Sequence, residues 1–203
     1  MAEPPQRPGD PPQRARLFSI EGYAIISADG AIADANAAFP AALSFEADKQ
    51  YYERELDRVD AVIQGRNSYE FQSNSPSRRR LVLTRAIAAL APDPERPRSF
   101  LWNPAGASLD VACAALGLAA GTLGVVGGTF VFDLFLDIGY DAFHLSRADK
   151  VKLPGGPPVF SQIGPNRSPE DLLAQHGLEP GPIQVLDEAN AVSLVTWARK
   201  ASL

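Results

Sequence analysis

The chain has 203 residues, of which 45% are hydrophobic and 21% are charged, as is ordinary for a soluble globular protein. At this length about 70% of the unfolded surface can be buried, so one domain, or two small ones, can hold a core without a disulfide. There are 19 Lys and Arg residues and 24 Asp and Glu residues, a net charge of −5, which argues against a protein whose main ligand is nucleic acid. One cysteine and two histidines argue against a metal site built from those residue types.

The N-terminal segment differs in composition from the rest. Residues 1–16 contain Pro-Pro-Gln-Arg twice and have almost no apolar side chains, so we expect a disordered, Pro- and Arg-rich tail followed by one domain over residues 17–203. The prolines argue against a secretory signal, and no run of about 18 apolar residues predicts a membrane span. Together with the single cysteine, these features favour a cytoplasmic protein.

Strand and helix patterns alternate along the domain. In chain order the patterns predict a strand at 17–27, a turn at Asp29-Gly30, a helix at 45–59 and strands at 61–64 and 81–84. They continue with a helix at 108–120, a strand at 123–126, a helix at 130–138, a strand at 142–146, an irregular Pro- and Gly-rich stretch at 154–182, and a hairpin of 183–186 with 191–197. This alternation predicts an α/β fold with a mainly parallel sheet and antiparallel C-terminal strands.

Two glycines join the strand at 123–126 to the following helix. Gly127 and Gly128 leave the backbone N–H groups open to an anion, and the helix that begins there has a partly positive N-terminus. A pyrophosphate would fit this turn. Strand-Gly-Gly-helix turns also serve packing alone, and that alternative remains open.

Three more predicted strands end in polar or glycine-containing segments. They are Ser27 to Ala33 with Asp29, Val62 to Glu70 with Gly65, Arg66 and Ser68, and Leu81 to Arg85 with Thr84. Ligands of parallel sheets bind beyond the carboxyl ends of the strands, so these segments are candidates for one site.

This set of motifs resembles the dihydrofolate reductase-like superfamily, which includes the reductase domain of bifunctional riboflavin-biosynthesis proteins. The similar segments are Gly65-Arg66-x-Ser68-Tyr69, Leu83-Thr84-Arg85, Val126-Gly127-Gly128 with Phe132, and Leu145-Ser146, spread over about residues 18–160. The resemblance implies a three-layer α/β fold. It also implies NADPH as cofactor, with Arg66, Ser68, Thr84 and Arg85 at its phosphates and Gly127, Gly128 and Thr129 at its pyrophosphate, next to Gly65 and Val126. Arginines at a 2′-phosphate would favour NADPH over NADH.

Reduction of a C=N bond also needs a proton donor. In dihydrofolate reductases a helix carboxylate after a Leu-Pro-Trp loop has this role, and here Phe39-Pro40-Ala41 stands at that loop. Counting from Pro40 indicates Glu46, whereas the family's acid-x-x-x-aromatic spacing indicates Asp48 with Tyr52. Either acid could instead simply favour the positive end of its helix.

The resemblance implies further substrate-binding residues. Arg78 falls where dihydrofolate reductases hold the glutamyl carboxylate of folate, although a run of three arginines is also a common solvated loop. Ser27-x-Asp29-Gly30 is close to the riboflavin branch, and Ser146 lies in the Leu-Ser strand end. Two departures from that branch are Val126 in place of a Glu and a missing Asp-x-Pro segment.

We therefore expect an NADPH-dependent reductase of a pyrimidine- or pterin-like heterocycle, closest to the riboflavin-type reductase. Dihydrofolate reductase is the alternative, and a non-catalytic nucleotide-binding module is the alternative of another class. The resemblance also implies a homodimer that pairs near the sheet edge. We expect a small-molecule substrate and no nucleic-acid or membrane partner.

Overall fold

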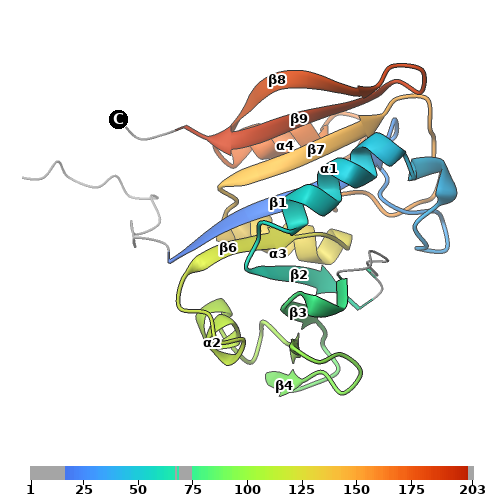
Figure 1. Ribbon diagram of the computed structural model, residues 1–203. Helices are drawn as coiled ribbons and strands as arrows, with labels where there is room; N and C mark the ends of the chain where they lie inside the picture. Colours follow the sequence, from blue (N-terminus) through green and yellow to red (C-terminus); the bar gives the residue numbers. More distant parts are fainter. Residues whose placement is uncertain (1–16, 67, 69–74, 201–203) are drawn as a thin grey trace, which may run out of the picture.

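The computed structural model describes residues 17–66, 68 and 75–200, which form one nine-stranded sheet flanked by helices (Figure 1). The strand order is β4-β5-β3-β2-β6-β1-β7-β9-β8. The strands are β1 (Phe18–Ser27), β2 (Ala61–Gly65), β3 (Arg80–Leu83), β4 (Leu90–Pro92), β5 (Ser99–Trp102), β6 (Gly121–Val125), β7 (Ala142–Ala148), β8 (Leu178–Asp187) and β9 (Val192–Arg199).

The six inner strands from β5 to β7 all run parallel, and β4, β9 and β8 are antiparallel to their neighbours. This confirms the predicted mainly parallel sheet with antiparallel C-terminal strands. Parallel pairing brings the carboxyl ends of β1, β2, β3 and β6 to one edge of the sheet. The C-terminal hairpin is longer than the sequence patterns predicted, because β8 begins at Leu178 and passes two register shifts, between Pro180 and Ile183 and between Val185 and Asp187.

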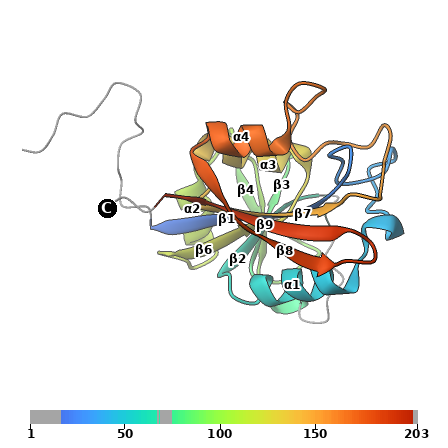
Figure 2. The ribbon, with the colours of Figure 1, turned by 90° about the horizontal axis from the view of Figure 1, so that it is seen from above.

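Helices cover both faces of the sheet and make three layers. Helix α1 (Glu46–Leu56) lies on one face, and α3 (Thr129–Ile138) and α4 (Pro169–Gln175) lie on the other (Figure 2). The main core lies on the face of α3 and α4. There the side chains of α2 (Leu109–Ala115), α3 and α4 pack with those of the strands, for example Cys113, Phe135 and Leu172. Across the sheet, Leu56 of α1 packs with Tyr23 and Val62 in a smaller cluster.

The stretch 154–182, predicted to be irregular, contains α4 and the start of β8. The helix begins with a capping box, in which the Ser168 side chain accepts from the N–H of Asp171 and the Asp171 carboxylate accepts from the N–H of Ser168. Pro169 fits its first turn, since proline needs no donor there. The capping signal is present in the sequence, but the surrounding Pro and Gly residues obscure it.

Two short strands were missed, and two helices are shorter than predicted, of which α1 ends at Leu56 instead of residue 59. Strands β4 and β5 are three and four residues long, too short for a clear periodicity. Helix α2 ends at Ala115 instead of continuing to residue 120, because Gly117 has a φ of 74° and cannot continue the helix. Short 3-10 turns span Ala41–Leu43 and Ser75–Ser77.

The predicted tail at 1–16 lies outside the described residues. Within the described part of the chain, every helix is too short, or not apolar enough, to cross a lipid bilayer.

Candidate active site

A cleft of about 640 Å³ opens at the edge of the sheet where the inner strands end. Its walls come from α1, the loop after β1, the turn between β6 and α3, and β7. Aromatic and aliphatic side chains make much of the lining, among them Tyr23, Ile25, Ile32, Phe39, Leu43, Phe45, Tyr51, Tyr52, Val126, Phe130 and Phe132. The polar lining residues include Ser44, Asp48, Lys49, Ser68, Thr129, His144 and Ser146. A mainly apolar cleft with few polar groups is typical of a site for a flat organic ligand.

The glycine turn between β6 and α3 forms one wall of this cleft. Gly127 and Gly128 have φ angles of 145° and 76°, which side chains other than glycine rarely adopt. A Cβ atom at Gly128 would meet only Val131 Cγ2, at 3.8 Å, so the protein leaves the space beside this residue open. The first N–H groups of α3 lack intrahelical acceptors. The turn is therefore an open cradle for an anion at a helix N-terminus.

Hydrogen bonds fix the position of this turn. The N–H of Gly65, at the end of β2, donates to the carbonyl of Gly127 over 3.1 Å. The hydroxyl of Thr129 donates to the carbonyl of Pro158, so its backbone N–H, not its side chain, remains for an anion. Ser68 lines the cleft beside Gly127, where its Oγ would lie 3.2 Å from a Cβ added to the glycine.

The other predicted phosphate-binding residues lie next to the cleft without lining it. Arg66 and Arg85 are exposed at the ends of β2 and β3. The guanidinium of Arg85 lies 5.7 Å from the ring centre of Phe130, in the first turn of α3, so it is directed toward the glycine turn. Thr84 is buried, and its hydroxyl accepts from the N–H of Ala86 in its own turn.

Asp48 is the acid that the structure places in the cleft. It lies in the first turn of α1, and Ser146 on β7 lines the same cleft. Burial raises the pKa of Asp48, and the Ser146 hydroxyl opposes this rise in part. Tyr52, one turn further along α1, also lines the cleft. Glu46 does not line it, because it is exposed and accepts from Gln50 Nε2 over 2.9 Å.

Two predicted substrate-binding residues instead support the turn after β1. The hydroxyl of the buried Ser27 donates to Asp29 over 2.5 Å, and Asp29 accepts from the N–H of Leu153 over 3.0 Å. These contacts tie the turn to residues 151–159, where Val159 donates to the carbonyl of Gly30. The pair thus shapes the loop that forms the cleft wall and does not line the cleft itself.

Arg78 lies outside the cleft. Its guanidinium is buried and pairs with Asp57 over 2.6 Å, in a second, smaller pocket that Arg79 and Arg98 also line. That pocket lies near the amino ends of β2, β3 and β5. The expectation that Arg78 faces the substrate is therefore at odds with its position, and Asp57 explains why the cation is held elsewhere.

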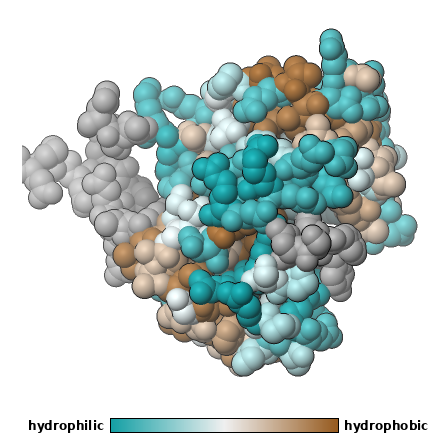
Figure 3. All heavy atoms as spheres, viewed as in Figure 1, coloured by the Kyte–Doolittle hydropathy of each residue, from teal (hydrophilic) through white to brown (hydrophobic). Residues whose placement is uncertain are grey.

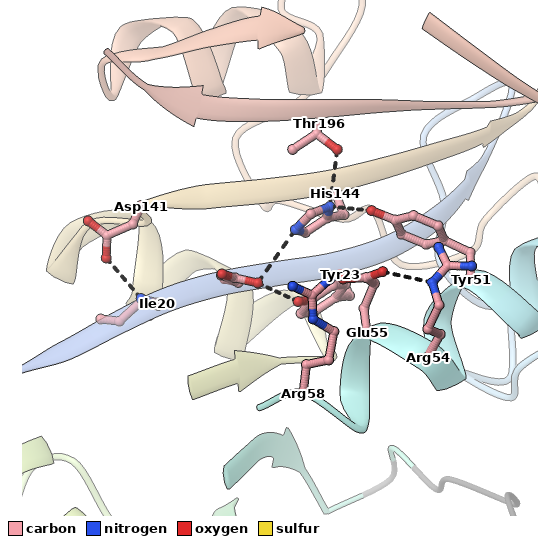
Figure 4. Close-up of polar contacts among 10 residues, drawn as sticks. Ile20, Tyr23, Tyr51, Arg54, Glu55, Arg58, Asp141, His144 and Thr196 are labelled. Atoms are coloured by element: carbon pink, nitrogen blue, oxygen red, sulfur yellow. Dashed lines mark hydrogen bonds and ion pairs between the residues drawn. The ribbon is translucent and has the colours of Figure 1, made fainter. Parts of the chain in front are cut away.

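A chain of polar side chains lines the cleft beside Asp48 and was not predicted (Figure 4). His144 Nδ1 lies 2.7 Å from the hydroxyl of Tyr51 and 3.1 Å from that of Thr196, and His144 Nε2 lies 3.6 Å from Glu21 Oε2. The hydroxyl of Tyr23 donates to Glu21 over 2.5 Å. The neighbouring His144 ring lowers the pKa of Glu21, whereas burial raises the pKa of Tyr51 and of Tyr23.

Two sequence signals could have found this chain. His144 precedes Ser146 by two residues on one strand, so both side chains point to the same face of the sheet. Tyr51 follows Asp48 by three residues on one helix, so both lie on the same side of it. No cluster of three or more potential metal-ligating side chains occurs in the part of the chain that the structure describes.

No protein-family model and no curated protein matches the chain. Several solved structures are similar to the chain. A dihydrofolate reductase from Enterococcus faecalis, complexed with NADP(H) and RAB-propyl, is 16% identical with a TM-score of 0.60, over 90% of this chain and 96% of that one. A diaminohydroxyphosphoribosylaminopyrimidine deaminase/5-amino-6-(5-phosphoribosylamino)uracil reductase from Thermotoga maritima is 16% identical with a TM-score of 0.61, over 90% of this chain and 56% of that one. A pyrimidine reductase-like protein from Corynebacterium diphtheriae is 12% identical with a TM-score of 0.60, over 91% of this chain and 92% of that one. The fold is therefore dihydrofolate reductase-like.

Proposed function

We propose that this protein is an NADPH-dependent reductase of a pyrimidine- or pterin-like heterocycle, closest to the reductase of riboflavin biosynthesis. The observation that carries the proposal is the presence of two different elements in one cleft. An open glycine turn at the N-terminus of α3 lies on one wall, and the half-buried Asp48 and the buried Ser146 lie on another. Neighbours of the same fold include a dihydrofolate reductase with NADP(H) and a 5-amino-6-(5-phosphoribosylamino)uracil reductase.

The residues at the glycine turn fit a dinucleotide. The backbone of Gly127, Gly128 and Thr129 would hold the pyrophosphate, because the side-chain-free turn leaves room for close approach. Ser68 lies next to this turn, and the exposed Arg66 and Arg85 at the neighbouring strand ends would pair with the phosphates of the adenosine half. When bound, NADPH supplies the hydride that reduces the carbon of a C=N bond.

Asp48 would act on the heterocycle itself. A carboxyl group whose pKa is raised by burial can hold a proton at a pH where an exposed aspartate has lost it. It can therefore pass a proton, directly or through water, to the nitrogen of the C=N bond as the carbon of that bond accepts hydride. In its ionised form the same group accepts hydrogen bonds from ring N–H groups. Ser146 lines the cleft together with this carboxyl group.

The alternatives differ in what the cleft binds. The turn of Ser27, Asp29 and Gly30, which is similar to the riboflavin branch, favours a riboflavin-type reductase. The pairing of Arg78 with Asp57 argues against a dihydrofolate reductase, because this cation does not line the cleft. A nucleotide-binding module without catalysis would bind NADPH and leave the inner part of the cleft without a ligand.

The test is a pair of measurements on the purified protein. Fluorescence or calorimetric titration with NADPH measures cofactor binding. Loss of NADPH absorbance with 5-amino-6-(5-phosphoribosylamino)uracil or with dihydrofolate measures turnover. Turnover with the first compound supports the proposal, and turnover with dihydrofolate alone supports the alternative enzyme. Binding without turnover of either compound favours the non-catalytic module, and lack of NADPH binding contradicts the proposal.

We also propose that the protein forms a homodimer through the edge strand β8. Seven consecutive residues of this strand, 179–185, are exposed, and Ile183 and Val185 are 72% and 67% exposed. Figure 3 shows hydrophobic surface along the top of the molecule, where Figure 1 places β8, whereas the outer surface of α1 is hydrophilic. An exposed edge strand with apolar side chains readily adds a second strand or sheet.

A further inference from the structure

The polar chain of Glu21, His144 and Tyr51 reaches the cleft next to Asp48, and the mechanism proposed above does not use it. The side chain of His144 is only 11% exposed, between β1, β9 and α1. Its two ring nitrogens have different surroundings. Nε2 faces the Glu21 carboxylate at 3.6 Å, and Nδ1 faces the hydroxyls of Tyr51 at 2.7 Å and Thr196 at 3.1 Å.

The charge of Glu21 determines where the imidazole keeps its hydrogen. A carboxylate only accepts hydrogen bonds. Tyr23 donates to Glu21, and the pKa of Glu21 is lowered through His144, so this side chain is ionised at neutral pH. A neutral His144 therefore keeps its single hydrogen on Nε2, which leaves Nδ1 as an acceptor.

The hydroxyl of Tyr51 must then change its direction with the charge of His144. Beside the neutral ring, the Tyr51 hydroxyl donates to Nδ1 and presents only oxygen lone pairs to the cleft. Beside the protonated ring, Nδ1–H donates to the Tyr51 oxygen, and the phenolic hydrogen is free to point into the cleft. Thr196 is further from Nδ1, so it is the weaker competitor for this bond.

We infer that Tyr51 recognises the ring substituent next to the N–H group that Asp48 binds, and that the protonation of His144 sets whether a carbonyl or an amino group is preferred there. The inference rests on the proposed function and names its substrate class more closely. Asp48 and Tyr51 lie three residues apart on α1 and both line the cleft, so they can contact adjacent positions on one edge of a heterocycle. A Tyr51 hydrogen suits the 2-oxo edge of a uracil, and a Tyr51 lone pair suits the 2-amino edge of a pterin.

Other charged groups lie around the polar chain of Glu21, His144 and Tyr51. Glu55 and Arg54 on α1 and Arg58 just after it lie near the chain (Figure 4), and the Arg54 guanidinium lies 5.0 Å from the ring centre of Tyr51. Glu55 is paired with both arginines, at 3.1 and 3.4 Å. Asp48 also faces the cleft and can titrate, so variants that keep Asp48 but change Tyr51 or His144 separate its effect from theirs.

The experiment compares two compounds, 5,6-diaminouracil and 2,5,6-triaminopyrimidin-4-one, which carry an oxo or an amino group at position 2. The amino compound also has one ring N–H fewer, a difference that does not change with the charge of His144. Their dissociation constants are measured by calorimetry with NADPH present, at a series of pH values between about 5.5 and 8.5. We expect the preference for the oxo compound to rise roughly tenfold as the pH falls, the size of one exchanged hydrogen bond. The midpoint should coincide with the titration of His144 in ¹⁵N NMR spectra, which contain only two histidines.

Three variants test the cause. Tyr51→Phe should make the preference independent of pH while retaining the ring contacts with His144 and Arg54. His144→Gln should do the same, and His176→Gln, at the end of α4, should leave the pH dependence intact.

A preference that does not change with pH in the unmodified protein, or one that still changes in Tyr51→Phe, would overturn the inference and leave the proposed function standing. If NADPH binds but neither pyrimidine does at any pH, both the inference and the proposed heterocycle substrate are wrong. Failure of NADPH itself to bind would contradict the proposed function separately.

Discussion

The ring of Tyr23 stacks on the imidazole of His144, with ring centres 4.5 Å apart and planes within 4° of parallel. The two residues are direct partners in the register of β1 with β7, and the same register places Ile25 opposite Ser146. Because side chains two residues apart on a strand share a face, His144 and Ser146 reach the same side of the sheet. One pair of central strands therefore positions both the polar chain and the partner of Asp48.

Asp48→Asn should abolish most turnover and stabilise the protein at neutral pH. Burial raises the pKa of Asp48, so between its unfolded and folded pKa values the folded state binds more protons than the unfolded state. Stability then falls as the pH rises through this window, and the penalty persists above it. An asparagine has no such penalty, whereas loss of the proton donor should slow turnover roughly 10²–10⁴-fold.

Thermal unfolding from acidic to neutral pH, together with NADPH oxidation, checks this prediction. Glu46→Gln is the matched control, because Glu46 lies on the same helix but outside the cleft. A higher melting temperature in both variants, or unchanged turnover in Asp48→Asn, would count against the role of Asp48.

Gly128→Val should abolish NADPH binding while the fold persists. The residue has a φ of 76°, so valine is strained there, but its Cβ would meet only Val131 Cγ2 at 3.8 Å. The added methyl groups would fill the space that a pyrophosphate needs. The control is Gly117→Val after α2, which has a φ of 74° and nothing within 4 Å of its Cβ. Both variants should lose similar stability, and only the first should lose NADPH affinity. Equal affinities in the two variants would remove the turn from the cofactor site.

Arg85→Ala should weaken binding of NADPH more than that of NADH. Only NADPH carries the 2′-phosphate, and a charge-assisted hydrogen bond contributes about 1.5–3 kcal/mol, which corresponds to a loss of roughly tenfold to a hundredfold. Arg98→Ala is the control, since Arg98 is exposed near the amino ends of the strands. Titration of each variant with both nucleotides measures the difference. Equal losses would instead assign Arg85 to the pyrophosphate, next to Phe130.

Ile183→Lys should convert a dimer to a monomer. A charge in the centre of the exposed apolar face of β8 would be desolvated by a second copy, and it costs little where the strand faces water. Sedimentation velocity of both proteins gives their masses in solution. The conservative variant Ile183→Val should keep the dimer, and a monomeric unmodified protein would show that β8 has no such role.

Local patterns in the sequence were enough to predict the architecture. The alternation of apolar strands with helix-period segments predicted a mainly parallel sheet. The resemblance of the short motifs at the strand ends to those of a known superfamily implied the more specific dihydrofolate reductase-like fold. The glycine turn was also recognisable, because positive φ angles and close backbone approach need glycine whatever the surroundings. Strands β4 and β5 escaped prediction, since three or four residues carry no clear period.

The phase of α1 decided between Glu46 and Asp48. Glu46 and Asp48 are two positions apart on the helix, so their side chains lie about 200° apart around its axis. Only one of them can therefore face the cleft. The sequence contains both acids at a helix start and leaves the choice open. The packing of Leu56 and Tyr52 against the sheet sets the rotation of the helix, and it turns Asp48 inward.

Most of the elements, their order and the chemistry at each strand end thus follow from the sequence, because they depend on residues that are close in the chain. Which side chains meet depends on how the whole chain folds. Arg78 pairs with Asp57, and His144 joins Glu21 on β1 to Tyr51 on α1. These partners are 21, 123 and 93 positions apart in the chain, and strand register and helix packing, which form only when the whole core is buried, bring them together.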